Sequence, residues 1–183
     1  VVDRHESLRT VFPEREGVAR QLILEGVEAR PRLSVCEVSE GELGEALTAA
    51  AQAGFDLERE APLRAHLFVL GASEQVLLLV LHHIAADGWS LGPLWRDLSL
   101  SYSARCAGEA PRLSPLAVQY ADYTLWQHSV LGEESDADSV LGRSLSFWRG
   151  ELAGLPEQLS LPFDRVRPAV LSYRGGSVEL RLC

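Results

Sequence analysis

Six consecutive apolar residues, Val76 to Leu81, lie within the run QVLLLVLHH and strongly restrict the folds open to this chain. A strand that is apolar on both faces needs cover on both sides, so the run predicts a central strand of a sheet. The preceding run PLRAHLFVL is separated from it by GASE, which predicts a β-hairpin. If the strand persists past its apolar part, His82 and His83 point to opposite faces and have different roles.

A helix is predicted before this hairpin. Ser39 and Glu42 form an S-x-x-E capping box, and apolar residues then recur at helical spacing until Gly54. Two short runs that favour β-strands, RQLILEG and PRLSVCEVS, precede the helix and are bounded by Gly and Pro. Strands, a helix and a hairpin in this order predict the α/β (α+β) class, with a mixed β-sheet flanked by helices.

A second, longer helix is predicted directly after the histidines. Ser90 is its expected N-cap, Pro93 is tolerated in its first turn, and Leu94 belongs to an apolar face with helical spacing. The acidic stretch LGEESDADSV is typical of a solvated loop between two later helices. Trp89 is expected in the core, and Tyr120 and Trp126 are expected to be packing residues and not ligand contacts.

The charge balance limits the partners of the chain. It carries 26 acidic and 17 basic residues, a net charge of -9, which argues against binding to nucleic acid or an anionic membrane surface. No stretch approaches the ~20 apolar residues of a membrane span, and the N-terminus lacks a signal-peptide pattern, so we expect a cytoplasmic protein. Cys36, Cys106 and Cys183 are far apart in sequence, which favours neither a disulfide framework nor a thiolate metal site.

The residues alone leave the role of the HHIAADG stretch open. The end of a strand beside the start of a helix is a place where side chains can reach a cleft, which favours a functional site. In the alternative interpretation, the histidines are ordinary hydrogen-bonded residues and Asp87 assists the helix N-terminus. A zinc site on His82, His83 and Asp87 is disfavoured, because adjacent strand residues diverge and no third nitrogen or sulfur ligand is near in sequence.

Five segments, in order along the chain, resemble motifs of one family. RHESLRTVF resembles an R-H-E-x-L-R-T-x-F motif, FDLEREAPLRAHLF is similar to an F-D-L…P-L-x-R-x-x-L segment, and HHIAADGWS resembles H-H-x-x-x-D-G. YADYTLWQ is similar to a downstream Y-x-D-[FY]-x-x-W motif, and LPFDRVRPAVLSYRGG resembles the stretch that leads toward a second half. The family is that of the condensation domains of nonribosomal peptide synthetases, in the chloramphenicol acetyltransferase-like superfamily. The resemblance covers essentially the whole chain.

The resemblance assigns different roles within HHIAADG. The second histidine of the family motif, which matches His83, faces the reaction channel, and the first, which matches His82, points into the structure. The aspartate of the motif, which matches Asp87, is implied to be structural, with its carboxylate turned away from the channel toward an arginine. Arg4 is the favoured partner and Arg9 is the other candidate, since a carboxylate buried beside an active site needs a counter-charge.

The reaction implied by the resemblance is amide formation. The amine of an acceptor aminoacyl thioester attacks a donor aminoacyl or peptidyl thioester, and the phosphopantetheine arms of two carrier domains hold these substrates. A neutral imidazole at His83 can accept a proton from the amine or hold the amine in line with the carbonyl. Gly88 is expected where a side chain would obstruct the approach to substrate or the turn into the helix. No metal, and no cofactor bound directly to the chain, is implied.

The resemblance also implies an incomplete domain and a set of partners. Residues 1–183 match a half-domain that lacks its first elements and its C-terminal subdomain, so we expect the isolated chain to be inactive. The expected partners are upstream and downstream peptidyl carrier domains, an adenylation domain of the same secondary-metabolite assembly line, and the C-terminal half. Two alternatives stay open: a docking module that holds carrier proteins without catalysis, and a stand-alone acyltransferase that uses coenzyme A thioesters. RHESLRT and YADYTLWQ favour the synthetase branch.

Overall fold

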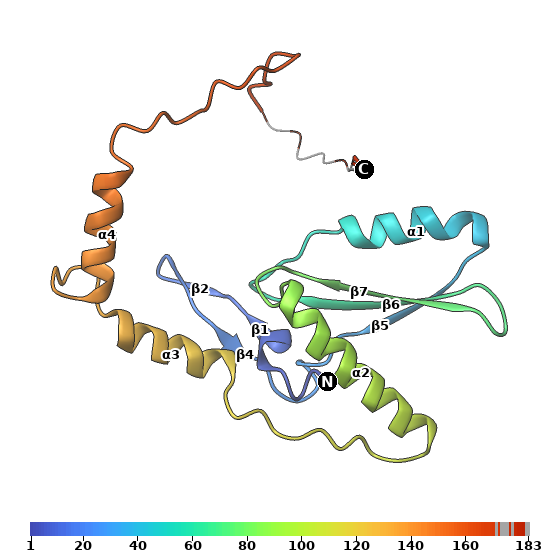
Figure 1. The fold of residues 1–183 in the computed structure, drawn as a ribbon. Helices are drawn as coiled ribbons and strands as arrows, with labels where there is room; N and C mark the ends of the chain where they lie inside the picture. Colours follow the sequence, from blue (N-terminus) through green and yellow to red (C-terminus); the bar gives the residue numbers. More distant parts are fainter. Residues whose placement is uncertain (171, 173–175, 177, 182–183) are drawn as a thin grey trace. The chain divides into compact units, whose positions relative to one another are not determined.

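The structure is a computed structural model that describes residues 1–170, 172, 176 and 178–181. The chain divides into two compact units, Val1–Leu131 and Gly132–Cys183, which are coloured blue to gold and gold to red in Figure 1. The first unit contains every described strand and three α-helices, and the second contains one described α-helix. Cys183 and part of the motif-like stretch LPFDRVRPAVLSYRGG lie outside the described residues.

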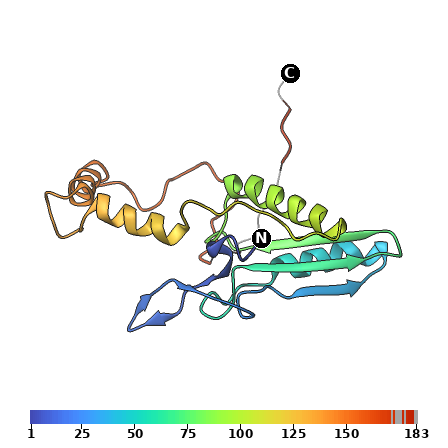
Figure 2. The same cartoon turned by 90° about the horizontal axis from the view of Figure 1, so that it is seen from below.

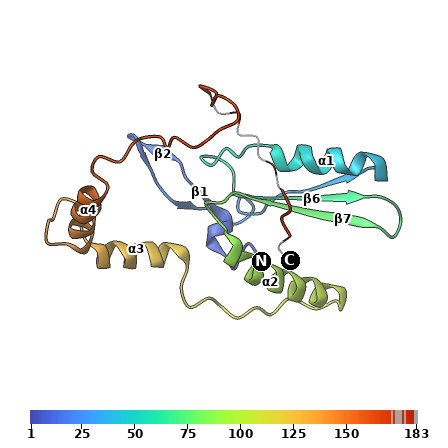
Figure 3. The ribbon, with the colours of Figure 1, turned by 45° about the horizontal axis from the view of Figure 1, so that its top comes forward.

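A three-stranded mixed sheet is the centre of the first unit. Its order is β5 (Leu33–Glu37), β6 (Leu63–Val69) and β7 (Gln75–Leu81), with β5 parallel to β6 and β6 antiparallel to β7. The predicted hairpin is therefore present, and β6 and β7 run side by side along its whole length (Figure 3). The prediction that β7 is central is wrong for the described sheet, in which β6 is central and β7 is an edge strand.

Two helices cover the opposite faces of this sheet, α1 (Glu40–Gln52) on one side and α2 (Gly88–Cys106) on the other (Figures 1 and 2). The capping box predicted for α1 is confirmed, because the backbone N–H of Ser39 donates to Glu42 Oε2 at 3.0 Å. Successive side chains of β6 point to opposite faces of the sheet, so the core is also divided between the α1 side and the α2 side. Odd-numbered Leu63 packs against Leu94 of α2, whereas even-numbered Phe68, also buried, lies on the face that α1 covers.

Short elements precede the sheet. The 3-10 helix η1 (Glu6–Arg9) leads into β1 (Thr10–Val11), which pairs with β4 (Leu22–Ile23). A second two-stranded pair, β2 (Glu14–Arg15) and β3 (Val18–Ala19), forms a tight hairpin whose turn holds Glu16 and Gly17 at positive φ. The strand predicted in RQLILEG is thus reduced to the two residues of β4.

The chain between β7 and α2, residues His82 to Asp87, is called the histidine turn. The core that positions it is small. Leu8 of η1, Leu63 of β6 and Leu94 of α2 form a buried cluster, against which Leu79 and Leu81 of β7 also pack. Three elements that are distant in sequence therefore meet at one end of β7. This end of the strand is where the HHIAADG stretch begins.

The three aromatic residues that were expected to serve packing are exposed, and the expectation that Trp89 lies in the core is wrong. Trp89 of α2 is 91% exposed, because five helical residues place it roughly 140° around the helix from buried Leu94. Tyr120 and Trp126 belong to α3 (Tyr120–Leu131) and are also more than half exposed. Their rings instead lie on either side of Tyr123, at 5.8 and 5.7 Å between ring centroids, on the surface of α3.

The second unit begins with the acidic stretch and continues into α4 (Val140–Glu151). The prediction of a loop between two helices is confirmed, since α3 ends at Leu131 and α4 begins at Val140. Ser139 caps α4 by accepting a hydrogen bond from the backbone N–H of Gly142 at 2.8 Å. Local hydrogen bonds of this kind define the unit more than burial does, because no residue of α4 is buried.

Candidate functional site

The HHIAADG stretch is a turn between the sheet and a helix. β7 ends at Leu81, so His82 and His83 both lie beyond the strand, and α2 begins at Gly88. The backbone holds the turn in place: His82 N–H donates to the carbonyl of Pro62 at 3.0 Å, and Ala85 N–H donates to the carbonyl of His82 at 3.0 Å. The two histidines are therefore oriented by turn geometry and not by the alternation of a strand.

The ring of His82 is engaged within the fold. Its Nδ1 accepts a hydrogen bond from the backbone N–H of Ile84 at 3.0 Å, which requires that nitrogen to carry no proton. The edge of the ring meets Phe55 at 5.8 Å between centroids, with the planes 82° apart. The guanidinium of Arg64 lies over the Phe55 ring, 4.2 Å from its centroid. These contacts are those of a side chain that shapes the turn.

The ring of His83 has a contrasting environment. The residue is exposed, and within the described part of the chain its ring has no hydrogen-bond partner. An imidazole in this state is free to accept a proton from, or to hydrogen-bond with, a molecule that approaches from solvent. Of the two neighbouring histidines, His83 is the one with unused chemistry.

Asp87 caps α2. Its Oδ1 accepts hydrogen bonds from Ser90 N–H at 3.0 Å and from the Ser90 hydroxyl at 2.7 Å, and Asp87 N–H donates to Ser90 Oγ at 3.1 Å. The hydrogen bond from the Ser90 hydroxyl is the largest of the causes that hold the pKa of Asp87 below its ordinary value. The prediction that Ser90 is the N-cap is therefore wrong by three residues, and Ser90 instead completes the capping box.

The expected ion pair between Asp87 and an arginine is absent from the described structure. Arg4 pairs with Asp97, and Arg9 pairs with Glu6 while donating to the carbonyl of Leu24. The exposed Asp87 carboxylate is already supplied with donors by the first turn of its own helix, so it needs no cation. Its position corresponds to the helix-capping alternative that the sequence left open.

Gly88 is not required by the packing of the described chain. A Cβ atom built at this position meets no heavy atom within 4 Å, and its φ lies outside the left-handed region. The expectation that a side chain would obstruct the turn into the helix is therefore wrong. Its expected role near a substrate stays a prediction.

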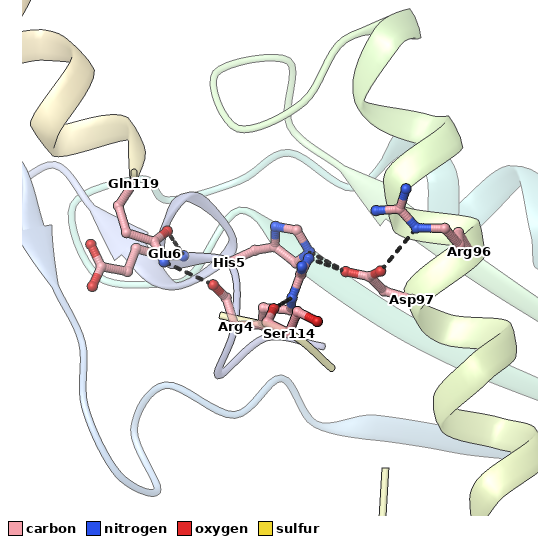
Figure 4. A network of polar contacts seen from close by, with 7 residues as sticks. All are labelled: Arg4, His5, Glu6, Arg96, Asp97, Ser114 and Gln119. Atoms are coloured by element: carbon pink, nitrogen blue, oxygen red, sulfur yellow. Dashed lines mark hydrogen bonds and ion pairs between the residues drawn. The ribbon is translucent and has the colours of Figure 1, made fainter. Parts of the chain in front are cut away.

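The buried ionic centre of the site is Asp97, whose side chain is 2% exposed (Figure 4). Its Oδ2 lies 2.6 Å from Arg4 Nη1 and 2.7 Å from His5 Nε2, and Oδ1 lies 3.4 Å from Arg96 Nε. Burial, the largest single influence, raises the pKa of Asp97, but the hydrogen bonds with His5 and Arg96 and the charges of Arg4 and His5 together outweigh it and hold the pKa below its ordinary value.

The same cluster fixes the N-terminal segment to the chain that follows α2. Arg4 Nε donates to the carbonyl of Ser114 at 2.8 Å, and Gln119 Nε2 donates to the carbonyl of Arg4 at 3.0 Å (Figure 4). Glu6 N–H donates in turn to Gln119 Oε1 at 3.2 Å. Sequence reasoning missed Asp97, although an acidic residue three positions after buried Leu94, on the same helix face, was a signal for it.

An apolar cavity of about 310 Å³ lies beside this cluster and the histidine turn. His5, Leu8, Leu81, Ala85 and Leu94 are among its lining residues, so it borders both the turn and the inner face of α2. Neither His82 nor His83 lines it. One side of the turn therefore borders an apolar cavity, whereas His83 lies on a side that faces solvent.

Clusters of metal-ligating side chains and membrane-spanning helices are both absent from the described residues. These residues contain no group of three or more His, Cys, Asp or Glu side chains arranged to hold a metal ion. Among their helices, none is both long and apolar enough to cross a membrane. Cys36 and Cys106 are unpaired and exposed.

Comparison with known proteins gives the family. Residues 1–182 match the family described as Condensation domain. The chain is 58% identical over 182 residues to the probable non-canonical nonribosomal peptide synthetase CymA of Salinispora arenicola, and 51% identical to the dimodular nonribosomal peptide synthase of Bacillus subtilis. Each match covers 100% of this chain, which spans 2% and 8% of these relatives.

Solved structures agree with this result. The X-domain from teicoplanin biosynthesis is 42% identical, with a TM-score of 0.82 over 93% of this chain and 37% of that one. The epimerization domain TycB3(E) of tyrocidine synthetase B, at 22% identity, shares the fold with a TM-score of 0.71. These neighbours confirm the predicted fold class, and together with the sequence match they show that the chain belongs to the condensation domain family of nonribosomal peptide synthetases.

Proposed function

We propose that this chain provides the histidine-bearing part of a domain that forms peptide bonds between two carrier-bound substrates. The family match over residues 1–182 is the observation that carries this proposal. The amine nitrogen of the acceptor attacks the thioester carbon of the donor, a C–N bond forms, and the C–S bond breaks. The proton lost by the amine passes to the departing thiolate, so the products are an amide on one arm and a free pantetheine thiol on the other.

His83 is the residue that acts on the attacking amine. It is exposed and its ring has no partner among the described residues, so both ring nitrogens are available. General-base help is worth about 10²–10⁴-fold, whereas alignment of two reactants gives effective molarities of about 10⁵–10⁸ M. His83 thus contributes proton transfer, or a hydrogen bond that aligns the amine, within a channel whose walls supply most of the positioning.

The remaining walls come from residues outside this chain. It spans 37% of the X-domain chain that it matches, and apolar side chains on the α2 side of the sheet stay exposed at Leu33, Val35 and Leu77. Such a face needs cover from another part of the domain. Carrier domains that present phosphopantetheine arms, and an adenylation domain that loads them, are the other proposed partners in the cytoplasm.

Single-turnover dipeptide formation between two loaded carrier domains tests the role of His83. In the complete domain, we expect His83→Ala to slow the reaction by about 10²–10⁴-fold. His128→Ala is the matched control, because His128 is an exposed histidine of α3, and it should leave the rate unchanged. A folded His83→Ala domain with a near-normal rate would remove His83 from the reaction.

The isolated chain provides a second test. Residues 1–183 alone include the histidine turn but lack the proposed far wall, so we expect them to form no dipeptide under conditions in which the complete domain turns over. Equal rates for the two proteins would show that these residues already contain a whole active site.

A docking module is the second candidate function. The teicoplanin X-domain, 42% identical to this chain, was also solved in a complex with OxyB, so a relative of this fold holds another protein. If the complete wild-type domain binds its carrier proteins yet makes no dipeptide from any loaded pair, the docking function replaces catalysis. An amide made from a coenzyme A thioester at the same rate as from a carrier-bound donor would instead support the stand-alone acyltransferase.

A further inference from the structure

A groove of about 330 Å³ lies on the first unit, away from the histidine turn, where the parallel strands β5 and β6 begin. We call it the arginine groove and define it by six of its lining residues: Arg30, Arg32, Ser34, Arg59, Arg64 and His66. It adjoins a second hollow of about 630 Å³ that shares Arg30, Arg32 and Arg59 with it. Its size falls in the range of small-molecule sites.

The charge of the arginine groove is opposite to that of the chain. The whole sequence has a net charge of -9, yet four arginines line this groove against two glutamates, Glu28 and Glu60. A concave surface with an excess of one sign of charge concentrates ligands of the other sign. The groove therefore favours an anion.

Two of the arginines are already used within the fold. Arg64 Nη2 lies 2.6 Å from Glu60 Oε1 and donates to the carbonyl of Gly54 at 2.6 Å. Arg59 forms a pair with Asp56 at 2.9 Å in which both side chains are exposed, so this pair is weak and easily exchanged.

The other two arginines are free to bind a ligand. Arg30 and Arg32 are exposed, and their side chains have neither an ion pair nor a hydrogen bond with any residue that the structure describes. They flank Pro31, which fixes the backbone between them and so limits the freedom of the pair. Both residues line the same groove, and each guanidinium presents forked N–H donors that fit tetrahedral oxyanions.

His66, which lines the groove, carries a buried ring nitrogen, Nε2, without a hydrogen-bond partner in the described structure. The ring is held by stacking on Phe68, at 6.2 Å between centroids, and Ser34 lies directly beside it in the β5–β6 register. A buried polar atom without a partner destabilises the fold, so a side-chain shift that let His66 meet a ligand oxygen in the groove would relieve that cost.

We propose that the arginine groove binds a phosphate ester, with Arg30 and Arg32 at its mouth and Ser34 and His66 at its wall. A phosphate group matches this set because it offers several acceptor oxygens and a charge that two unpaired arginines can balance. The phosphate has two chemical sources, a free phosphorylated metabolite or the phosphodiester of a pantetheine arm. A free phosphate as ligand is independent of the reaction proposed for His83, whereas the pantetheine arm as ligand rests on that proposal.

Calorimetric titration of the complete domain, at constant ionic strength, tests this site. The probes are inorganic pyrophosphate, phosphopantetheine, and pantetheine, which lacks the phosphate. We expect saturable binding of at least one phosphate probe and none of pantetheine. Binding of phosphopantetheine alone assigns the site to the arm, whereas equal binding of pyrophosphate assigns it to free phosphates.

Matched charge variants decide whether the arginines act specifically. The double variant Arg30→Gln/Arg32→Gln should weaken phosphate binding at least tenfold. The control Arg15→Gln/Arg20→Gln removes the same charge from two exposed arginines of the β2–β3 region, outside the groove, and should leave binding unchanged. Equal weakening by both pairs, or the absence of saturable phosphate binding to the wild type, would overturn the proposal.

Discussion

Arg4 and Asp97, which are 93 residues apart in sequence, form an ion pair of 2.6 Å in which the aspartate side chain is 2% exposed. The pair joins the segment before η1 to the middle of α2, and His5 contacts the same carboxylate oxygen. Because α2 starts immediately after the histidine turn, this contact also fixes one boundary of the turn. The stability of the site and that of the pair should therefore change together.

Replacing Asp97 by alanine should lower the free energy of unfolding by about 3–5 kcal/mol, because Arg4 would remain partly buried without its counter-charge. Urea denaturation of the complete domain measures this loss. Asp56→Ala is the control, since it removes an exposed pair with Arg59 and should cost about 0–1 kcal/mol. Equal losses for the two variants would mean that Asp97 is accessible to water in solution.

Acid should remove the contribution of Asp97. Its pKa is lowered in the folded chain relative to an ordinary value of 3.8, so the folded state resists protonation and the unfolded state binds the proton first. The stability that the carboxylate adds is therefore complete above pH 3.8 and is lost as the pH falls through the folded pKa. The difference in unfolding free energy between the wild type and Asp97→Asn should narrow below pH 3.8. A difference that stays constant on acidification through this range would contradict the assignment.

Asp87→Ala should destabilise the domain modestly, and clearly less than Asp97→Ala. The change removes the acceptor for Ser90 at the first turn of α2, together with a negative charge near the positive end of the helix dipole. Asp87→Asn should recover most of the loss, because asparagine caps helices about as well as aspartate. Unfolding midpoints in urea compare the three proteins. If alanine costs as much at position 87 as at position 97, Asp87 has a buried cation as its partner.

The two neighbouring histidines should respond differently to the same change. His82→Ala removes the acceptor of the exposed Ile84 N–H and the edge contact with Phe55, so we expect a loss of about 0.5–1.5 kcal/mol. His83→Ala removes an exposed ring without a described partner and should leave the unfolding midpoint unchanged. Thermal or urea unfolding of both variants checks this contrast, and the opposite order of stabilities would exchange their roles.

Local signals in the sequence predicted the local structure well. The capping box at Ser39, the hairpin of β6 and β7, and the loop from Leu131 to Val140 each depend on residues that are close in sequence. The place of β7 in the sheet could not be predicted in this way, because an apolar run indicates burial without indicating which strands are its neighbours. The apolar run Val76 to Leu81 thus predicted the strand β7 correctly, but its central place in the sheet wrongly.

The charged residues show the same limit. Asp87 stands at the start of α2 and Asp97 in its middle, and sequence motifs drew attention to the first. Which aspartate receives Arg4 depends on where the N-terminal segment crosses the helix, a relation between residues 93 positions apart. Burial then makes the choice energetically important, since Asp97 lies on the inner face of α2 and Asp87 lies in solvent at its end.

The hydrogen bond from Gln119 to the carbonyl of Arg4 spans 115 residues, which sets an order of events during synthesis. At about 5–20 residues per second, a ribosome needs roughly 6–23 s to pass from one of these residues to the other. Throughout that interval the RHESLRT segment has been synthesised but cannot take up all of its final contacts. The nascent chain therefore exposes one of its most ionic segments to chaperones before the residues that will receive it have all been made.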